Sequence, residues 1–324
     1  MATLRRLAPL VPIRMTGPGL FTGRVANLTI SGPMGREGLW FQREDLEVDP
    51  RVRATADALS DEPLHPAFAS LPARCTTLRA APGVLFGTVE HILSALDALG
   101  ITDALVEFSE AETPILDGCA QRFVDMLAFS EPVEKGPLEV RTLPHSVEVV
   151  DARDPSARIV ASPRASAGRS YRYDLDYSGL GSGIGSGGAA AERPRPSRPR
   201  AAAWDGTPEQ YADQVAPART FCLRSEYDAM RAAGMLDGIP EDAAVVFGAD
   251  GPVNTELRFA NEASRHKLLD LIGDLALIGE RVQMDVHAVR SGHALNQRLA
   301  RAVRDVLGLG GEGRGGARTR SRSS

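Results

Sequence analysis

The chain has 324 residues, of which 43% are hydrophobic and 24% charged, which is enough apolar material for a buried core and unlike a disordered chain. Its formal net charge of -5 gives no global reason to expect a nucleic-acid partner. Three cysteines without a CxxC spacing exclude a disulfide framework, and no apolar run is long enough to span a bilayer. We therefore expect a cytoplasmic protein with no nucleic acid and no stable membrane insertion, and we expect it to be a monomer.

The first half of the chain alternates between strand and helix patterns. Short apolar runs bounded by glycine and proline indicate strands, and apolar residues at helical spacing indicate helices, one of which ends at Gly100. The predicted strands are 25–30, 38–42 and 103–108, and the predicted helices are 89–100 and 117–127.

The second half repeats the order helix, strand, helix. A helix is predicted over 265–279, a strand over 282–289 and a second helix over 291–303, with Ser291 at its N-cap position. Two copies of one order predict two similar α+β domains, the first over 1–133 and the second over 134–308. Residues 134–140 are then the connection between the domains.

Two segments lack apolar periodicity. Residues 178–203 are rich in glycine, proline and arginine and cannot bury a face, so they are predicted to be a disordered insertion in the second domain. Residues 309–324 are expected to form a disordered basic tail for the same reason.

A polar stripe lies on the helix predicted at 265–279. His266, Asp270 and Asp274 are spaced four residues apart, so their side chains share one face of the helix. Imidazole and carboxylate are both good ligands for Zn²⁺. The stripe is therefore a candidate metal platform, although an ordinary charged helix surface explains the same pattern.

The first half offers a histidine at the corresponding place. His91 is near the start of the helix at 89–100 and is preceded by Glu90. If His91 completes the metal site, Glu90 can act as the general base that activates a water at the metal. The alternative is that Glu90 is a first-turn acid that favours the helix dipole.

A third histidine, His293, stands in the first turn of the last predicted helix. The helix N-terminus would lower its pKa, and a nearby carboxylate such as Asp274 would raise it. A protonated histidine could stabilise an oxyanion and protonate a leaving amine. A partly buried histidine that fills the helix start is the alternative.

Taken together, these fragments resemble the UDP-3-O-acyl-N-acetylglucosamine deacetylase family of lipid A biosynthesis. They occur in the family's order and span residues 16–305. The matching motifs are TGPGLFTG (16–23), TVEHILSALDALGITD (88–103), ETPILDG (112–118), PARTF (217–221), RHKLLDLIGDL (265–275) and SGHALNQ (291–297). The resemblance implies an α+β fold of two similar domains, each a small mixed sheet packed on helices, with the active site between them.

The resemblance also implies a role for each matching residue. His91, His266 and Asp270 correspond to the ligands of a catalytic Zn²⁺, and Glu90 to the general base. His293 corresponds to the residue that stabilises the oxyanion and assists departure of the amine, with Asp274 orienting it. Thr220 would donate its hydroxyl to the tetrahedral intermediate. Phe221 and Lys267 would contact the substrate.

The implied reaction hydrolyses the 2-acetamido group of a UDP-glucosamine that carries a 3-O-acyl chain. The acyl passage is expected within 222–247, lined by Leu223, Met230, Met235 and Val245. Phe21, Cys222 and Glu226 depart from the family pattern, and the 178–203 insertion interrupts a compact region. A zinc deacetylase of another acetamido sugar nucleotide, or a zinc-binding homologue without catalysis, are the alternatives.

Overall fold

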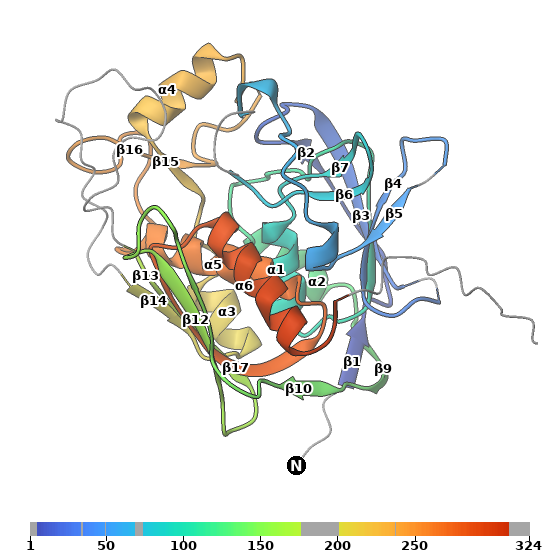
Figure 1. The fold of residues 1–324 in the computed structure, drawn as a ribbon. Helices are drawn as coiled ribbons and strands as arrows, with labels where there is room; N and C mark the ends of the chain where they lie inside the picture. The colour runs from blue at the N-terminus through green and yellow to red at the C-terminus, as the bar shows by residue number, and fades with distance from the viewer. Residues whose placement is uncertain are drawn as a thin grey trace, which may run out of the picture.

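Two mixed β-sheets enclose a central layer of helices in the computed structural model (Figure 1). The structure describes residues 5–33, 35–48, 50–68, 74–175, 201–236 and 238–310. The helices are α1 (Glu90–Ala98), α2 (Gln121–Ala128), α3 (Pro208–Gln214), α4 (Arg224–Ala232), α5 (Glu262–Ala276) and α6 (His293–Val306), with short 3-10 turns η1 (Ala56–Ala58) and η2 (Pro66–Phe68).

The first sheet is formed by residues of the first half, in the strand order β2-β3-β8-β4-β5. Only β8 and β4 run parallel; the other neighbours are antiparallel. The strands are β2 (Ile13–Pro18), β3 (Val25–Ser31), β4 (Leu39–Arg43), β5 (Arg51–Arg53) and β8 (Ala104–Phe108).

The second sheet has the order β11-β12-β17-β13-β14, and β10 also pairs with β17. Again one neighbouring pair on the main path, β17 and β13, is parallel, and the others are antiparallel. The strands are β10 (Val140–Thr142), β11 (Val147–Val150), β12 (Arg158–Pro163), β13 (Arg169–Asp174), β14 (Ala201–Trp204) and β17 (Arg281–Val289).

The two sheets therefore share one topology. In each, the third strand in space is the last in the chain, and it follows a long helix (α1 before β8, α5 before β17) and precedes another (α2, α6). The predicted α+β class and the repeated helix–strand–helix order are both confirmed.

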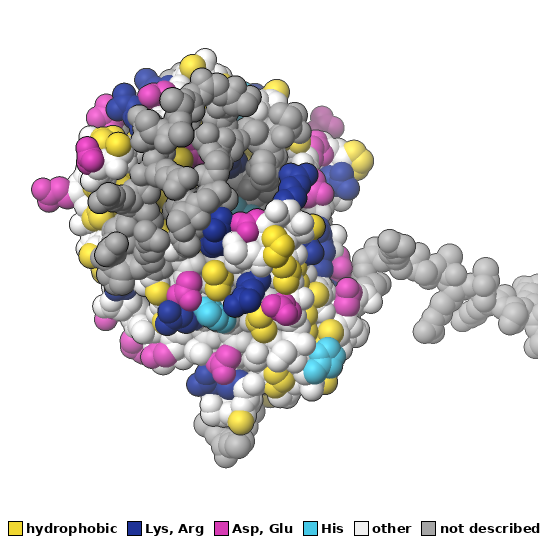
Figure 2. Space-filling view, turned by 60° about the vertical axis from the view of Figure 1, so that its left-hand side comes forward, with side chains coloured by type: hydrophobic (Ala, Val, Ile, Leu, Met, Phe, Trp, Pro, Cys, Tyr) yellow, Lys and Arg dark blue, Asp and Glu magenta, His cyan; other side chains and the backbone are white. Residues whose placement is uncertain are grey.

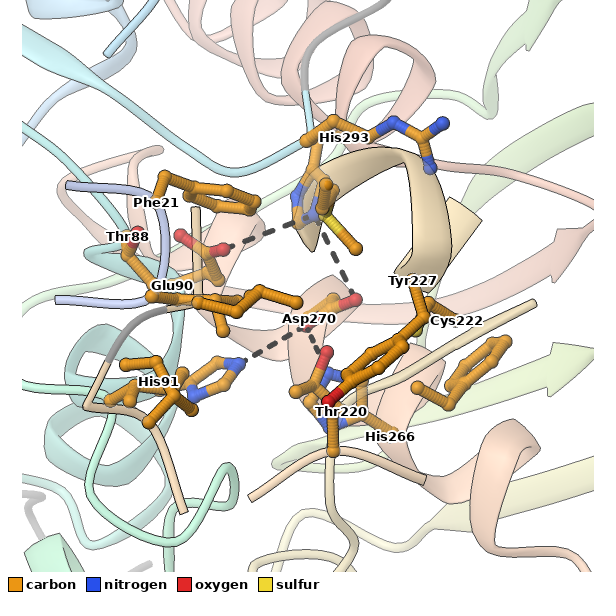
Figure 3. A pocket seen from close by; sticks show the side chains of 18 of the residues that line it. Phe21, Thr88, Glu90, His91, Thr220, Cys222, Tyr227, His266, Asp270 and His293 are labelled. Atoms are coloured by element: carbon orange, nitrogen blue, oxygen red, sulfur yellow. Dashed lines mark ion pairs between the residues drawn. The ribbon is translucent and has the colours of Figure 1, made fainter. Parts of the chain in front are cut away.

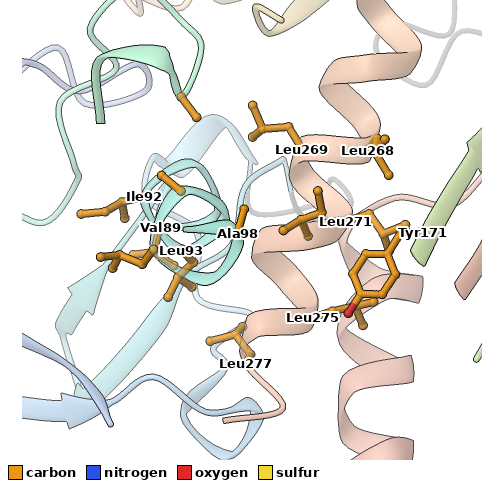
Figure 4. Close-up of a cluster of buried hydrophobic side chains, with 14 of the residues drawn as sticks. Val89, Ile92, Leu93, Ala98, Tyr171, Leu268, Leu269, Leu271, Leu275 and Leu277 are labelled. Atoms are coloured by element: carbon orange, nitrogen blue, oxygen red, sulfur yellow. The ribbon is translucent and has the colours of Figure 1, made fainter. Parts of the chain in front are cut away.

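Helices α1 and α5 pack against each other at the centre of the molecule. Ile92 and Leu93 of α1 and Leu271 and Leu275 of α5 are buried in the core around this pair of helices (Figure 4). Full burial of each such side chain contributes about 1.5–3 kcal/mol. The core is therefore shared by the two halves rather than divided between them.

Gly273 allows the closest approach of the two helices. A Cβ atom at Gly273 would lie 2.0 Å from the carbonyl oxygen of Glu90. No real side chain tolerates that contact, so glycine is required where the α5 backbone meets the start of α1. The contact brings His91 and His266 to the same point between the halves.

Three small two-stranded sheets complete the fold. They are β1 (Arg5–Ala8) with β9 (Val133–Pro137), β6 (Leu78–Ala81) with β7 (Val84–Phe86), and β15 (Phe221–Leu223) with β16 (Val245–Phe247). Helix α4 lies between β15 and β16 in the chain, and none of its side chains is fully buried. It stands at the periphery of the molecule in Figure 1.

The segment 134–140, predicted as the connection between the domains, contributes to two strands, because β9 pairs with β1 and β10 pairs with β17. Several predicted helix boundaries are wrong. Helix α2 begins at Gln121 rather than at 117, and α5 begins at Glu262 rather than at 265. The N-cap of α6 is Gly292, whereas the hydroxyl of Ser291 donates to Asn296 Oδ1 at 2.8 Å.

The predicted insertion at 178–203 extends too far at its C-terminal end. Residues 201–203 belong to β14, which pairs with β13 and places Ala202 opposite Tyr173. Small apolar residues fit this half-buried strand, and backbone pairing compensates for their short side chains. The rest of the insertion and residues 311–324 of the tail lie outside the described residues. Leu309, assigned to the tail, packs against the core.

None of the helices in the described ranges is both long and apolar enough to cross a bilayer. Figure 2 shows one face of the molecule, on which basic and acidic side chains are interspersed rather than segregated.

Candidate functional site

A cavity of about 210 Å³ opens between the two halves, where α1, α5 and α6 begin. Eight of the nine residues predicted for the site line this cavity, and Figure 3 labels six of them, including His91, His266 and Asp270. The ninth, Asp274, does not line the cavity but is hydrogen-bonded to His293. The eight are Glu90, His91, Thr220, Phe221, His266, Lys267, Asp270 and His293.

His91, His266 and Asp270 form a buried group that could hold a metal ion. One ligand atom from each lies within 4.8 Å of the others. Asp270 Oδ1 is 3.3 Å from His266 Nε2 and 3.9 Å from His91 Nε2. Two imidazoles and one carboxylate that leave a side open to a cavity are the donor set of a catalytic rather than a structural zinc-type site.

The protonation of this group suits a cation. Burial, and the positive charge that His266 could carry, lower the pKa of His91 to about 3, and burial also lowers the pKa of His266. Burial opposes ionisation of Asp270, but Lys267, 2.8 Å from its Oδ2, and the histidines hold its pKa well below the usual range. The group therefore offers two neutral imidazoles and one carboxylate, as metal binding requires.

The ring of His266 is held in one orientation. Its Nδ1 lies 3.0 Å from the carbonyl oxygen of Ala218. Because a carbonyl can only accept, Nδ1 carries the proton and Nε2 presents its lone pair to the cavity. The rings of His91 and His266 pack edge to face, with their centroids 5.0 Å apart.

Glu90 stands beside this group without belonging to it. Its side chain is buried, and burial raises its pKa to about 8. Oε2 accepts a hydrogen bond of 2.9 Å from the backbone N–H of Thr76, while Oε1 lies 3.9 Å from His293 Nε2. One oxygen is thus anchored and the other faces the pocket, as a general base requires.

His293 and Asp274 form an ion pair beside Glu90 and Asp270. Nδ1 of His293 is 3.0 Å from Asp274 Oδ2, and Nε2 points toward the pocket, 3.8 Å from Asp270 Oδ2. Burial disfavours the charged ring, but Asp274 outweighs it and raises the pKa of His293 to about 9. The carboxylate prevails over the helix N-terminus, so His293 is a proton donor at neutral pH.

Thr220 and Phe221 are fixed by backbone pairing between the halves. Thr220 N–H donates to the carbonyl of Gly118 at 2.8 Å, and Val245 N–H donates to the carbonyl of Thr220 at 2.8 Å. Gly118, at φ +80°, permits this approach, since a Cβ there would lie 1.6 Å from the carbonyl oxygen of Ala243. The ring of Phe221 packs edge-on against His266, with centroids 6.3 Å apart.

The wall of the cavity away from the charged groups is apolar. Of the four residues expected to line an acyl passage, Met230 lines the cavity. Leu223 and Val245 pack with the main core instead, and Met235 belongs to a smaller buried cluster. The residues that line this wall are Leu20, Phe21, Cys222, Tyr227, Met230, Leu236 and Ile239. Phe21 and Cys222, two of the departures noted in the sequence, thus face the pocket.

Glu226, the third departure, joins the two halves at this wall. Its Oε1 lies 2.9 Å from Arg74 Nη1, and its Oε2 accepts from the N–H of Leu223 at 2.9 Å. It therefore caps α4 and ties that helix to the segment before β6.

Sequence reasoning missed Thr76 and Asn296. The hydroxyl of Thr76 donates to Asp274 Oδ1, and Asn296 Nδ2 donates to Asp274 Oδ2 at 2.9 Å. It also missed Arg219, whose buried guanidinium pairs with Glu262 at 2.9 Å beside Thr220. Thr76 lies in a loop without periodicity, so only the fold reveals it. Asn296 belongs to the SGHALNQ motif, one turn after His293, and that spacing could have indicated it.

A buried His–His–Asp group with a glutamate and a histidine–aspartate pair beside it at one cavity defines a candidate metal-dependent hydrolase. A sequence model of the family described as UDP-3-O-acyl N-acetylglycosamine deacetylase matches residues 10–305. The chain therefore belongs to the UDP-3-O-acyl-N-acetylglucosamine deacetylase family, as its motifs predicted, and it is an amidohydrolase.

Curated relatives that match this chain over most of their length have the same name. A UDP-3-O-acyl-N-acetylglucosamine deacetylase of Anaeromyxobacter sp. is 35% identical over 90% of this chain and 86% of its own. The one from Thermosynechococcus vestitus is 32% identical over 89% and 90%, and the one from Pasteurella multocida 31% identical over 90% and 87%.

Proposed function

We propose that this chain removes the acetyl group from the 2-acetamido nitrogen of UDP-3-O-acyl-N-acetylglucosamine, an early committed step of lipid A biosynthesis. The observation that carries the proposal is one cavity with a His–His–Asp group and two proton-transfer residues at one wall and apolar side chains at the other. A substrate with a polar sugar and an acyl chain needs both walls. The names of the relatives give the reaction and the substrate.

We infer that His91, His266 and Asp270 hold Zn²⁺. The donor set, the neutral imidazoles and the carbonyl that orients His266 fit this ion. When bound there, Zn²⁺ supplies Lewis-acid polarisation of the amide carbonyl and a lowered pKa for a water beside it.

The residues around the ion divide the proton transfers. Glu90 Oε1 takes a proton from the attacking water as the new C–O bond forms at the acetyl carbon. The Thr220 hydroxyl donates to the oxygen that becomes negative in the tetrahedral intermediate. His293 Nε2–H then donates to the sugar nitrogen as the C–N bond breaks, which leaves acetate and a free amine.

Lys267 and Phe221 would position the substrate. The Lys267 ammonium lies 5.6 Å from the centre of the Phe221 ring and 2.8 Å from Asp270 Oδ2. A sugar that rests on Phe221 would have this cation within reach. A nucleotide-sugar substrate and free cysteines are consistent with a cytoplasmic place of action.

We also propose that the chain divides into domains at residues 133–134, with the first domain over 1–133 and the second over 134–308. The matching topology of the two sheets supports this division. β9 lies at the division itself and pairs back onto β1 of the first domain.

The test is acetate release from two sugar nucleotides by the purified protein. UDP-3-O-acyl-N-acetylglucosamine should be hydrolysed far faster than UDP-N-acetylglucosamine, which lacks the acyl chain. Equal rates would favour a deacetylase of another acetamido sugar nucleotide, an alternative that Phe21 and Cys222 in the pocket motivate. No acetate from either, in zinc-loaded protein, would favour a homologue that binds zinc without catalysis.

A further inference from the structure

Thr76 touches both proton-transfer groups of the site at once. It is fully buried and lies in the loop before β6, in the first half of the chain. Its backbone N–H donates to Glu90 Oε2 at 2.9 Å, and its side-chain hydroxyl donates to Asp274 Oδ1. The base is on α1 and Asp274 is on α5, so Thr76 bridges the two halves at the reacting centre.

The hydrogen bonds around Thr76 have a fixed direction. Gln297 Nε2, an obligate donor, lies 3.0 Å from the Thr76 hydroxyl, so that oxygen accepts from Gln297 and gives its own proton to Asp274. The nearby His293 Nδ1, 3.3 Å from the hydroxyl, carries a proton that is already directed to Asp274. A chain of donors therefore ends on one carboxylate.

Asp274 consequently accepts from three donors. It is wholly buried and accepts from Thr76 on one oxygen and from His293 and Asn296 on the other. The amide of Asn296 is itself oriented by the hydroxyl of Ser291 at 2.8 Å. A buried carboxylate with all its partners holds one position, whereas one with a missing donor is costly and can move.

We propose that Thr76 is a positioning residue that sets the geometry of both proton transfers: its N–H leaves only Glu90 Oε1 free as the base, and its hydroxyl locks Asp274 and thereby His293. The proposal rests on the proposed deacetylase function. Thr76 itself does not touch the reacting atoms, and it acts through Glu90 and Asp274.

Thr76→Val separates the two contacts, because valine keeps the shape and the backbone N–H but removes the hydroxyl. We expect kcat to fall about 10- to 100-fold, the range for residues that orient site groups, with KM changed less than about twofold and zinc content unchanged. Thr76→Ser, which retains the hydroxyl, should restore most of kcat. Thr77→Val is the matched control, since the Thr77 hydroxyl contacts only Cys75 Sγ, at 3.8 Å, among the contacts described.

A double-mutant cycle with Asp274→Asn tests whether Thr76 acts through Asp274. In the Asp274→Asn background the further loss caused by Thr76→Val should nearly vanish, because the carboxylate that Thr76 orients is already gone. Additive losses, no rescue by serine, or wild-type kcat in a folded Thr76→Val protein would each overturn the proposal. If Thr76→Val does not fold, Thr76→Ala enters the same cycle.

The proposed function can fail separately. If the wild-type protein releases no acetate from the acylated sugar nucleotide, the deacetylase proposal fails before any variant is compared. If the wild type is active and Thr76→Val is equally active, only the role of Thr76 is refuted.

Discussion

The two halves of the molecule share one topology but contribute unequally to the pocket. The first half gives one imidazole, His91, and the base Glu90 from adjacent positions at the start of α1. The second half gives His266, Asp270 and Asp274 along α5 and His293 at the start of α6. The longer α5 presents one face over more turns, so it can supply two ion ligands and the partner of the acid. In the proposed mechanism the two halves therefore have different roles: the second half mainly holds the ion and the acid, and the first half supplies the base.

The largest expected effect is the loss of the ion ligand on α5. Asp270→Ala should remove most of the zinc and lower activity by about 10³-fold or more, because Asp270 is within reach of both histidines. Elemental analysis together with acetate release measures both. Asp213→Asn, an exposed acid on α3, is the control. Full zinc content in Asp270→Ala would refute this assignment of the second half.

Loss of the base on α1 should separate catalysis from binding. Glu90→Gln should lower kcat by about 10²- to 10³-fold, as removal of a general base does, while zinc content stays at the wild-type level. Acetate release measures kcat, and elemental analysis measures the zinc content. Wild-type kcat, or loss of zinc with loss of activity, would mean that the halves do not divide their roles in this way.

The contact between the helices is the next point to break. Gly273→Ala places a Cβ 2.0 Å from the Glu90 carbonyl oxygen and should push α1 away from α5. We expect the free energy of unfolding to fall by about 1–3 kcal/mol, the cost of overpacking, and activity to fall with it. Denaturant titration measures the free energy of unfolding, and acetate release measures the activity. Ser264→Ala on the same helix is the control. It removes a hydroxyl that has no hydrogen-bond partner among the described residues, so it should change stability little.

The acid pair predicts a pH dependence. His293 must be protonated to donate, and its folded pKa is raised to about 9, so activity should fall as pH rises through 9. Glu90 must be ionised to act as the base, so activity should also fall as pH drops below its raised pKa of about 8. Asp274→Asn removes the charge that raises this pKa and should move the alkaline limb to lower pH. Profiles of kcat/KM for both proteins check the shift, and an unmoved limb would exclude His293 as the titrating donor.

The smallest expected effect is that of low pH on zinc binding. Histidine ligands with an ordinary pKa would release zinc as pH drops through about 6.5, because the metal needs the neutral imidazole. The lowered pKa values of His91, about 3, and of His266 mean that both ligands stay neutral further into acid. Zinc content after dialysis at pH 5.5 should therefore match that at pH 8, with circular dichroism as the folding control. Release of zinc near pH 6.5 would contradict the burial argument.

Much of this architecture could be predicted because local patterns carry it. Apolar periodicity gave both copies of helix, strand and helix, and the four-residue spacing of His266, Asp270 and Asp274 gave the polar face of α5. What local patterns cannot give is a contact between distant loops and helices. Thr76 and Arg219 are hydrogen-bonded to Asp274 and Glu262, which lie 198 and 43 residues away in the chain, and their own neighbourhoods have no periodicity.

The sequence was also misleading at weak strands. Ala201–Trp204 and Val133–Pro137 contain small, polar or glycine residues, which argue against strands when taken alone. Each is a strand because a neighbour offers unpaired backbone groups, β13 for the first and β1 for the second. Tertiary pairing overrides local propensity at such edges. The lining of the acyl wall was predicted incorrectly for a related reason, since Leu223 and Val245 belong to the paired strands β15 and β16 and pack with the main core.

The most direct test of the central claim is a zinc titration of chelated protein, followed by mass-spectrometric detection of the deacetylated product from UDP-3-O-acyl-N-acetylglucosamine. If His91, His266 and Asp270 from the two halves form one catalytic site, chelated protein should give no product, and activity should return in proportion to added Zn²⁺ up to a single ion per chain. Full activity in the presence of chelator, or no product at any zinc level, would contradict it.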